Sequence, residues 1–175
     1  MRLLHLTFTH VLLLFMTIVS TTTAQDWANL NRFKEENKEV GLPRTNEDRV
    51  VFMGNSITQG WKEQVPEFFN NPNYINRGIG GQTTPQMLLR FRQDVLKLYP
   101  KVVVILAGTN DIAGNTGPST LEIIEDNIYS MAELARVHNV EVVLCSVLPV
   151  YDYPWQTGLE PAEKIVELNS RLQKY

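Results

Sequence analysis

The sequence has 175 residues, of which 43% are hydrophobic and 20% charged, and its formal net charge is −3. That length suits a single domain with a packed core. The slight acidic excess, without any cluster of basic residues, argues against a nucleic-acid partner. The single cysteine, Cys145, has no partner for a disulfide and is interpreted as a core residue.

Residues 1–24 have the pattern of a cleavable secretory signal peptide. Arg2 precedes an apolar run that includes residues 11–16, and a polar stretch then ends at Ala24, with the small residue Thr22 at position −3. A membrane anchor is the alternative, but the apolar run is short for a membrane span. No second apolar stretch suggests a membrane span. We therefore predict a secreted or periplasmic protein whose residues 25–175 form one domain.

Apolar, β-branched runs alternate with segments of helical spacing after the predicted cleavage site. Strands are predicted, in chain order, at residues 50–53, 74–76, 101–107 and 140–147, the second being the weakest. Helices are predicted over residues 88–98, 121–135 and 161–175, because apolar residues recur there at three- and four-residue steps. Continuous apolar strands separated by helices predict an α/β protein with three layers, α/β/α, around a central parallel sheet.

Three glycine-containing turns follow the first three predicted strands. Their sequences are GNSIT (residues 54–58), RGIGGQT (77–83) and AGTND (107–111). Ligands bind beyond the carboxyl ends of the strands in an open parallel sheet, so we expect the turns to meet at one edge. Ser56 would then stand at a strand-to-helix turn, where outward-pointing backbone N–H groups can bind an anion.

Each turn also has a purely structural interpretation. Ser56 is a favoured N-cap residue, Gly80 and Gly81 allow positive φ, and Asn110 and Asp111 can cap the segment that follows. A dinucleotide-binding loop is another reading of the glycines, but RGIGGQT lacks the G-x-G-x-x-G spacing. The serine turn also differs from the nucleophile elbow of α/β-hydrolases, which has a glycine two residues after the serine.

In this order and at these strand ends, the three turns resemble the sequence blocks of the SGNH or GDSL-type esterases and acylhydrolases. The similarity runs from about Asp26 to the last residue, and AGTNDIAGNTGP is its most specific part. The resemblance implies a flavodoxin-like SGNH hydrolase fold and a carboxylic ester hydrolase. It assigns Ser56 as the nucleophile, with an oxyanion hole formed by the N–H of Ser56, the N–H of Gly81 and the side-chain amide of Asn110. No cofactor is implied, and no cluster of residues has the spacing of metal ligands.

Two departures from the family pattern concern the surroundings of the nucleophile. Asn55 stands where the family usually has Asp, which changes the local charge although both side chains accept hydrogen bonds in turns. A serine nucleophile also needs a base, and the family's Asp-x-x-His pair does not occur in this sequence. His5 and His10 lie in the predicted signal peptide, and His138 is expected at the opposite edge of the sheet. We therefore expect the base, with the last strand and helix of the fold, to lie beyond Tyr175, and this chain alone to be almost inactive.

The segment LPVYDYPW (residues 148–155) follows the fourth predicted strand and should reach the same edge as Ser56. Its aromatic residues either contact the substrate or pack the loop onto the domain, and Trp61 has the same two interpretations. Export favours a small-molecule or glycan ester as substrate, in particular an O-acetylated carbohydrate. A lysophospholipase or thioesterase is the alternative, as is a non-catalytic glycan- or lipid-binding module with the same fold.

Overall fold

A computed structural model describes residues 26–175, so the predicted signal peptide lies outside the described residues. Four parallel strands form one sheet in the order β2-β1-β3-β4. They are β1 (Val50–Gly54), β2 (Tyr74–Gly78), β3 (Val102–Leu106) and β4 (Glu141–Leu144). The four predicted strands are confirmed, with ends that differ by up to three residues.

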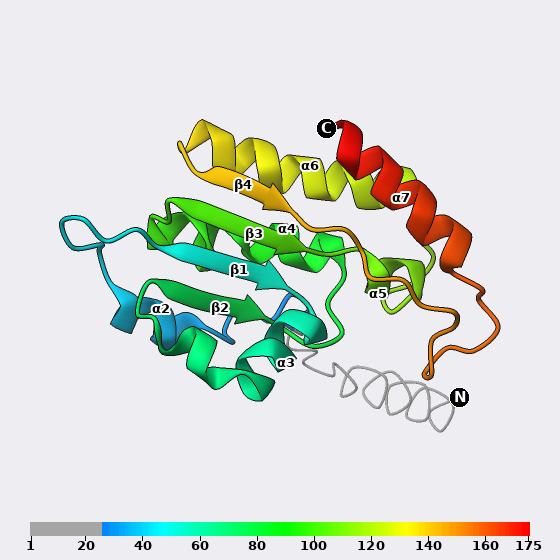
Figure 1. The fold of residues 1–175 in the computed structure, drawn as a ribbon, viewed down its shortest axis with the longest axis horizontal. Coiled ribbons are helices and arrows are strands. Elements are labelled where there is room, and N and C mark those ends of the chain that lie inside the picture. The colour runs from blue at the N-terminus through cyan, green and yellow to red at the C-terminus, as the bar shows by residue number, and fades with distance from the viewer. Residues whose placement is uncertain (1–25) are drawn as a thin grey trace, which may run out of the picture.

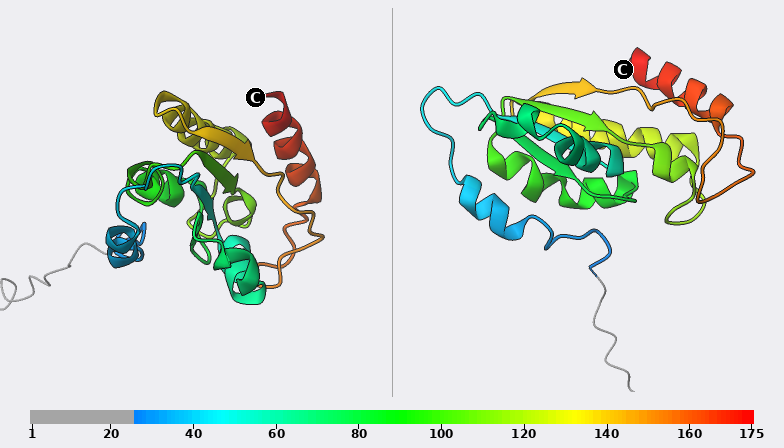
Figure 2. Two further views of the ribbon diagram at one scale, coloured as in Figure 1. Left: turned by 60° about the vertical axis from the view of Figure 1, so that its left-hand side comes forward. Right: turned by 60° about the horizontal axis from the view of Figure 1, so that its bottom comes forward.

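Helices cover both faces of this sheet (Figures 1 and 2). α3 (Ser56–Gln64) packs on β1 and β2, while α4 (Thr84–Asp94) and α6 (Leu121–Val137) pack against each other on the other face. α7 (Ala162–Lys174) contacts α6 and the short α5 (Thr109–Ile112), and α2 (Lys34–Val40) precedes the sheet. The predicted three-layer α/β architecture is confirmed. Among residues 26–175, no helix combines the length and apolarity needed to cross a membrane.

The core lies between the sheet and the paired helices α4 and α6. Val51 and Met53 of the central strand β1 are fully buried, as are Phe91 of α4 and Met131 of α6. A central strand that is covered on both faces needs apolar side chains on both, which is why β1 is a continuous apolar run. β4 pairs only with β3 within the described chain, and its Val143 is 47% exposed.

Two glycines allow α3 to begin directly against the ends of the strands. A Cβ atom on Gly54 would lie 2.0 Å from Oγ1 of Thr58, and one on Gly78 would lie 2.2 Å from the backbone nitrogen of Gln59. Asn76 then fixes the helix, since its Nδ2 donates to the carbonyl of Thr58 at 2.6 Å. This close packing holds the first turn of α3, which carries Ser56, at the carboxyl edge of the sheet.

Candidate active site

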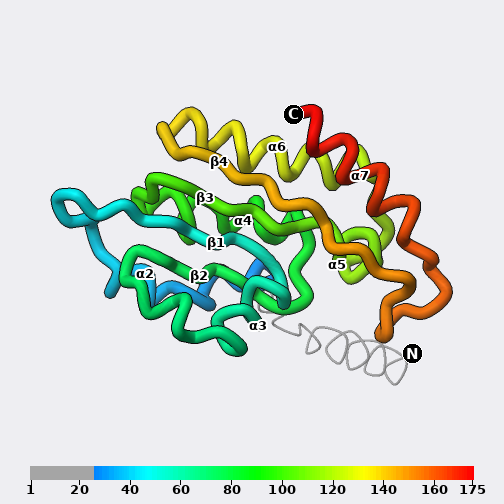
Figure 3. The backbone as a smooth tube through the Cα atoms, in the orientation of Figure 1, coloured from blue at the N-terminus to red at the C-terminus, as the bar shows by residue number. Residues whose placement is uncertain are grey.

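The three glycine-containing turns lie together at the carboxyl edge of the sheet, where the chain leaves all four strands on the same side (Figure 3). The N–H of Ile79 in the second turn donates to the carbonyl of Gly54 in the first at 3.0 Å. A Cβ atom built on Gly80 would lie 3.9 Å from the Cβ of Ser56. The amide Nδ2 of Asn110 in the third turn donates to the carbonyl of Gln82 in the second at 2.8 Å. The second turn thus bridges the other two.

Ser56 is the first helical residue of α3 and does not cap it. The N-cap is Asn55, which is buried and whose Oδ1 accepts a hydrogen bond from the N–H of Ile57 at 3.0 Å. The capping interpretation of Ser56 is therefore wrong. A neutral amide oxygen caps the helix here, a role that a carboxylate of Asp could also perform. The Ser56 side chain is exposed and its hydroxyl is available for chemistry.

Two backbone N–H groups in the turns around Ser56 have no acceptor within residues 26–175. Ser56 opens α3, so its N–H has no partner within the helix. Neither this N–H nor that of Gly81 donates to any acceptor within residues 26–175. Gly81 has a φ of 75°, a left-handed conformation that turns the loop at this point.

Asn110 also lies inside a helix instead of at its cap. The N-cap of α5 is Gly108, so the capping interpretation of Asn110 is wrong. The side chain is only 2% exposed, and it uses one of its two N–H groups to hold the carbonyl of Gln82. The second N–H stays available at the same edge as Ser56.

Asp111 anchors the helices behind the site. Its carboxylate is buried and accepts hydrogen bonds from the N–H of Thr84 at 2.9 Å and from the Thr84 hydroxyl at 2.6 Å. Burial raises the pKa of Asp111 to about 6, and the bonds from Thr84 oppose this shift. The contact ties the start of α4 to α5, and so fixes α5 relative to the second turn.

A fully buried arginine joins the ends of two strands to the bridging turn. The guanidinium of Arg90 in α4 donates to the carbonyls of Gly54 at 3.2 Å and Arg77 at 2.9 Å, and to the side-chain oxygen of Gln82 at 2.6 Å. The carboxylate of Asp94 forms an ion pair with the guanidinium, with Oδ2 of Asp94 3.2 Å from Nη1 of Arg90. Burial lowers the pKa of Arg90 to about 10, against the opposing effect of Asp94, so the side chain stays protonated at neutral pH.

The roles of Arg90 and Gln82 were not predicted from the sequence. Arg90 and Asp94 are four residues apart, a spacing that is typical of ion pairs on exposed helix faces. The only available signal was that Arg90 directly precedes Phe91 and Asp94 directly precedes Val95, two apolar residues of the predicted helix. Gln82 also donates through Nε2 to the carbonyl of Ala28 at 2.8 Å, which connects the second turn to the segment before α2.

No histidine of residues 26–175 lies beside Ser56. His138, at the end of α6, contacts the carbonyl of Leu134 through Nδ1 at 2.7 Å and Arg92 through Nε2 at 3.3 Å. It precedes β4, whereas Ser56 follows β1, so in this parallel sheet the two residues lie at opposite edges. Cys145 is only partly buried, contrary to the core interpretation, and burial raises the pKa of its thiol.

Trp61 and Trp155, for which the sequence allows either substrate contact or packing, have different surroundings. Trp61 stacks on Phe68, with ring centroids 4.6 Å apart, and meets the edge of Phe52 at 5.4 Å, so it packs within an aromatic cluster. Trp155 is 57% exposed in the loop after β4. Its Nε1 donates to Oδ1 of Asn115 at 3.1 Å, and Nδ2 of Asn115 donates to the carbonyl of Gly81 at 3.1 Å. Trp155 is therefore linked to the second turn.

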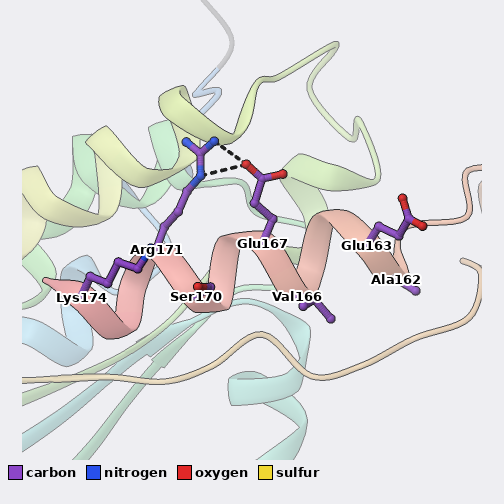
Figure 4. Close-up of a pocket in the computed structure, with 7 residues that line it drawn as sticks. All are labelled: Ala162, Glu163, Val166, Glu167, Ser170, Arg171 and Lys174. Carbon is purple, nitrogen blue, oxygen red and sulfur yellow. Dashed lines mark hydrogen bonds and ion pairs between the residues drawn. The ribbon is translucent and has the colours of Figure 1, made fainter.

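A hollow of about 590 Å³ lies along α7 (Figure 4). Side chains of α7 alone line it, and Arg171 and Glu167 form an ion pair beside it. The lining residues are Ala162, Glu163, Val166, Glu167, Ser170, Arg171 and Lys174. None of the three turns contributes to it, so it is separate from the candidate site.

Comparison with known proteins gives consistent results. Residues 52–175 match the GDSL-like Lipase/Acylhydrolase family. A crystal structure from Bacteroides fragilis, described as a candidate acylhydrolase, is 49% identical and superposes with a TM-score of 0.84 over 86% of this chain and 73% of its own. The crystal structure of the acetyl xylan esterase AlAXEase is 25% identical, with a TM-score of 0.54 over 72% of this chain and 71% of its own.

Among curated proteins, subunit alpha1 of platelet-activating factor acetylhydrolase IB from Bos taurus is 32% identical over 134 residues. That match covers 73% of this chain and 53% of the bovine protein, so the chain spans about half the length of this relative. The family match covers most of the sequence and includes all three turns. The chain belongs to the GDSL-like lipase/acylhydrolase family.

Proposed function

We propose that the protein is a serine esterase that hydrolyses carboxylic esters through an acyl-serine intermediate, with Ser56 as the nucleophile. The observation that carries this proposal is the set of unused donors around Ser56. The N–H groups of Ser56 and Gly81 have no acceptor within residues 26–175, and Asn110 keeps one N–H of its amide available. Donors held in place before the reaction are what a developing oxyanion requires.

The proposed reaction follows from these groups. The hydroxyl oxygen of Ser56 attacks the ester carbonyl carbon and loses its proton to a base, while the carbonyl oxygen becomes negative. The N–H groups of Ser56 and Gly81 and the amide of Asn110 stabilise that oxygen. The bond to the alcohol then breaks, the alcohol leaves with a proton, and an acyl-serine remains. Attack by water on the acyl-serine releases the carboxylic acid and restores the hydroxyl of Ser56.

Residues 26–175 contain no histidine that could act as the general base for Ser56. A serine hydroxyl without a base is a weak nucleophile. With His138 at the opposite edge of the sheet, we propose that residues 26–175 alone hydrolyse esters slowly. Activity is therefore measured on the gene-encoded protein.

The preferred acyl group is proposed to be acetyl. The bovine relative is named an acetylhydrolase and one structural neighbour is named an acetyl xylan esterase, so acetyl removal is common to both. The signal-peptide pattern of residues 1–24 supports export, and we propose an O-acetylated carbohydrate outside the cytoplasm as substrate.

The decisive variant is Ser56→Ala in the gene-encoded protein, assayed with p-nitrophenyl acetate. Hydrolysis should fall by at least about 1000-fold, because the nucleophile is lost. Circular dichroism and the melting temperature should stay close to those of the wild type, since the Ser56 side chain is exposed. Ser170→Ala, at an exposed serine of α7 outside the three turns, is the matched control and should keep full activity. Retained hydrolysis in a folded Ser56→Ala protein would remove Ser56 from the mechanism.

A further inference from the structure

The loop after β4 reaches the same edge as Ser56 (Figure 3) and is held in a defined shape. The carboxylate of Asp152 accepts hydrogen bonds from the N–H groups of Gly158 at 2.7 Å and of Tyr153 at 2.9 Å. Tyr153 is 2% exposed, and its hydroxyl lies 3.0 Å from the hydroxyl of Thr109, next to Asn110 in the third turn. The loop is therefore attached to the candidate site through the buried side chain of Tyr153.

Trp155 is fixed on this loop while most of its ring stays open to solvent. The indole packs at a tilt of 36° on Tyr153, with ring centroids 5.1 Å apart. Its N–H is held by Asn115, and the amide of Asn115 holds the carbonyl of Gly81. An indole ring with its polar edge already bonded and 57% of its surface exposed presents an apolar face at low entropic cost.

The surroundings of Trp155 fit a hydroxyl-bearing ring better than an alkyl chain. The adjoining segment 114–118 is exposed and has the sequence GNTGP, so amide and hydroxyl groups flank the indole. A sugar ring offers C–H groups on one face and hydroxyls around its rim, which match an apolar platform with polar flanks. A fatty chain instead needs an enclosed apolar groove.

We propose that Trp155 is the platform on which the alcohol half of the substrate, a sugar ring, stacks while its acetyl ester faces Ser56. This inference rests on the proposed function for the position of the ester, but the binding of the sugar does not depend on catalysis. Asn115 orients the indole and connects the occupied platform to the loop that holds the N–H of Gly81.

The first test measures binding without turnover. The Ser56→Ala form of the gene-encoded protein is titrated with xylotriose, cellotriose and chitotriose by calorimetry and tryptophan fluorescence. At least one sugar should bind, Trp155→Ala should weaken that binding by about 10-fold, and Trp155→Phe should retain most of it because a ring face remains. Trp61→Phe is the control, since Trp61 packs within the aromatic cluster. Absence of binding by all three sugars, or equal binding by the Trp155→Ala protein, would overturn the proposal.

The second test compares two acetates in a pH-stat: an acetylated xylo-oligosaccharide and ethyl acetate, which has no ring. Trp155→Ala should raise KM for the sugar ester by about 10-fold with kcat little changed, and should change kcat/KM for ethyl acetate by at most a few-fold. Equal losses on both esters would mean that Trp155 only supports the loop of Gly81, and would contradict the platform. A lysophospholipid is assayed as a third substrate. If Trp155→Ala slowed the hydrolysis of the lysophospholipid and of neither acetate, Trp155 would contact a lipid, and the proposed sugar platform would be contradicted. A wild type that binds sugar but hydrolyses neither ester would refute the proposed esterase and leave the platform in place.

Discussion

A substitution at Asn110 distinguishes a catalytic role of the side chain from a structural one. One of its N–H groups holds the carbonyl of Gln82, and the other is assigned to the oxyanion. Asn110→Ala should lower kcat by about 100- to 1000-fold with little change in KM, because the second bond forms mainly in the transition state. Loss of the bond to Gln82 should also lower the free energy of unfolding by about 0.5–1.5 kcal/mol.

Steady-state kinetics and urea unfolding of the gene-encoded protein check both parts of this prediction. Asn110→Asp should be at least as damaging to kcat, since a carboxylate would face the developing negative charge. Asn127→Ala is the control: it loses bonds to the Thr84 hydroxyl and the Ile123 carbonyl, so it should lose stability and keep kcat. A normal kcat in folded Asn110→Ala protein would rule out the oxyanion assignment.

Asp111 makes stability depend on pH in a direction unusual for a carboxylate. Its folded pKa of about 6 lies above the ordinary value of 3.8, so the folded state holds the proton more tightly than the unfolded state. The stability that this group contributes is fully present below about pH 4 and is lost as pH rises through about 6. The loss is on the order of 3 kcal/mol.

Asp111→Asn removes this titration. The difference in unfolding free energy, variant minus wild type, should therefore rise between pH 4 and pH 7. Urea titrations at four pH values give the difference directly, because the other carboxylates contribute equally to both proteins. A constant difference across this range would mean that burial does not raise the pKa of Asp111.

The junction of β2 with α3 depends on the absence of a side chain at Gly78. Gly78→Ala would place a Cβ atom 2.2 Å from the backbone nitrogen of Gln59, and backbone cannot move aside as a flexible side chain can. We expect the free energy of unfolding to fall by about 1–3 kcal/mol or more. Gly60, in the same helix, has no heavy atom within 4 Å of such a Cβ, so Gly60→Ala should be stabilising by about 0.5–1 kcal/mol. Thermal melts of the two variants should shift in opposite directions, and a common direction would count against this packing.

Arg90 of α4 is proposed to position the first two turns for catalysis. In Arg90→Lys, a single ammonium cannot reach the carbonyls of Gly54 and Arg77 and the side chain of Gln82 together. We expect kcat to fall by about 10-fold or more with KM nearly unchanged, since displacement of positioned groups by even 1 Å can cost 100-fold in rate. Arg92→Lys changes an exposed arginine two residues further along α4 and should leave kcat unchanged.

Stability must be measured beside the kinetics of the Arg90 variant. Under conditions where Arg90→Lys is fully folded, a kcat equal to that of the wild type would show that Arg90 supports only the fold. Arg90→Met should be less stable than Arg90→Lys, because it leaves Asp94 buried without a cationic partner.

The helices and strands were predictable where hydrophobic periodicity follows burial directly. The pattern Ile165, Leu168 and Leu172 predicted the buried face of α7, and the apolar run of residues 50–53 predicted the central strand. The turns were located because glycine and asparagine mark the strand ends. The contacts made by Arg90 and Gln82 were not predictable. The spacing of charged residues along a helix is the same whether that face packs against the ends of two strands or faces solvent.

Across the whole molecule, parallel strand order explains why residues distant in sequence form one candidate site. Each strand points its carboxyl end to the same edge, so the turns after β1, β2 and β3 and the loop after β4 come together there (Figure 3). Arg90, Asp111 and Asn115 then link these segments by hydrogen bonds. The resulting candidate site has the proposed nucleophile at the start of a helix, the proposed oxyanion donors on neighbouring turns and the proposed aromatic platform on the last loop.

The most direct test of Ser56 as the nucleophile is covalent trapping in the gene-encoded protein. A fluorophosphonate that reacts with activated serines is added, and the modified peptide is identified by mass spectrometry. We predict one adduct per chain, on Ser56, with none formed in Ser56→Ala and normal labelling in Ser170→Ala. An adduct on a different residue, or an unmodified Ser56 in a protein that hydrolyses acetyl esters, would contradict the account.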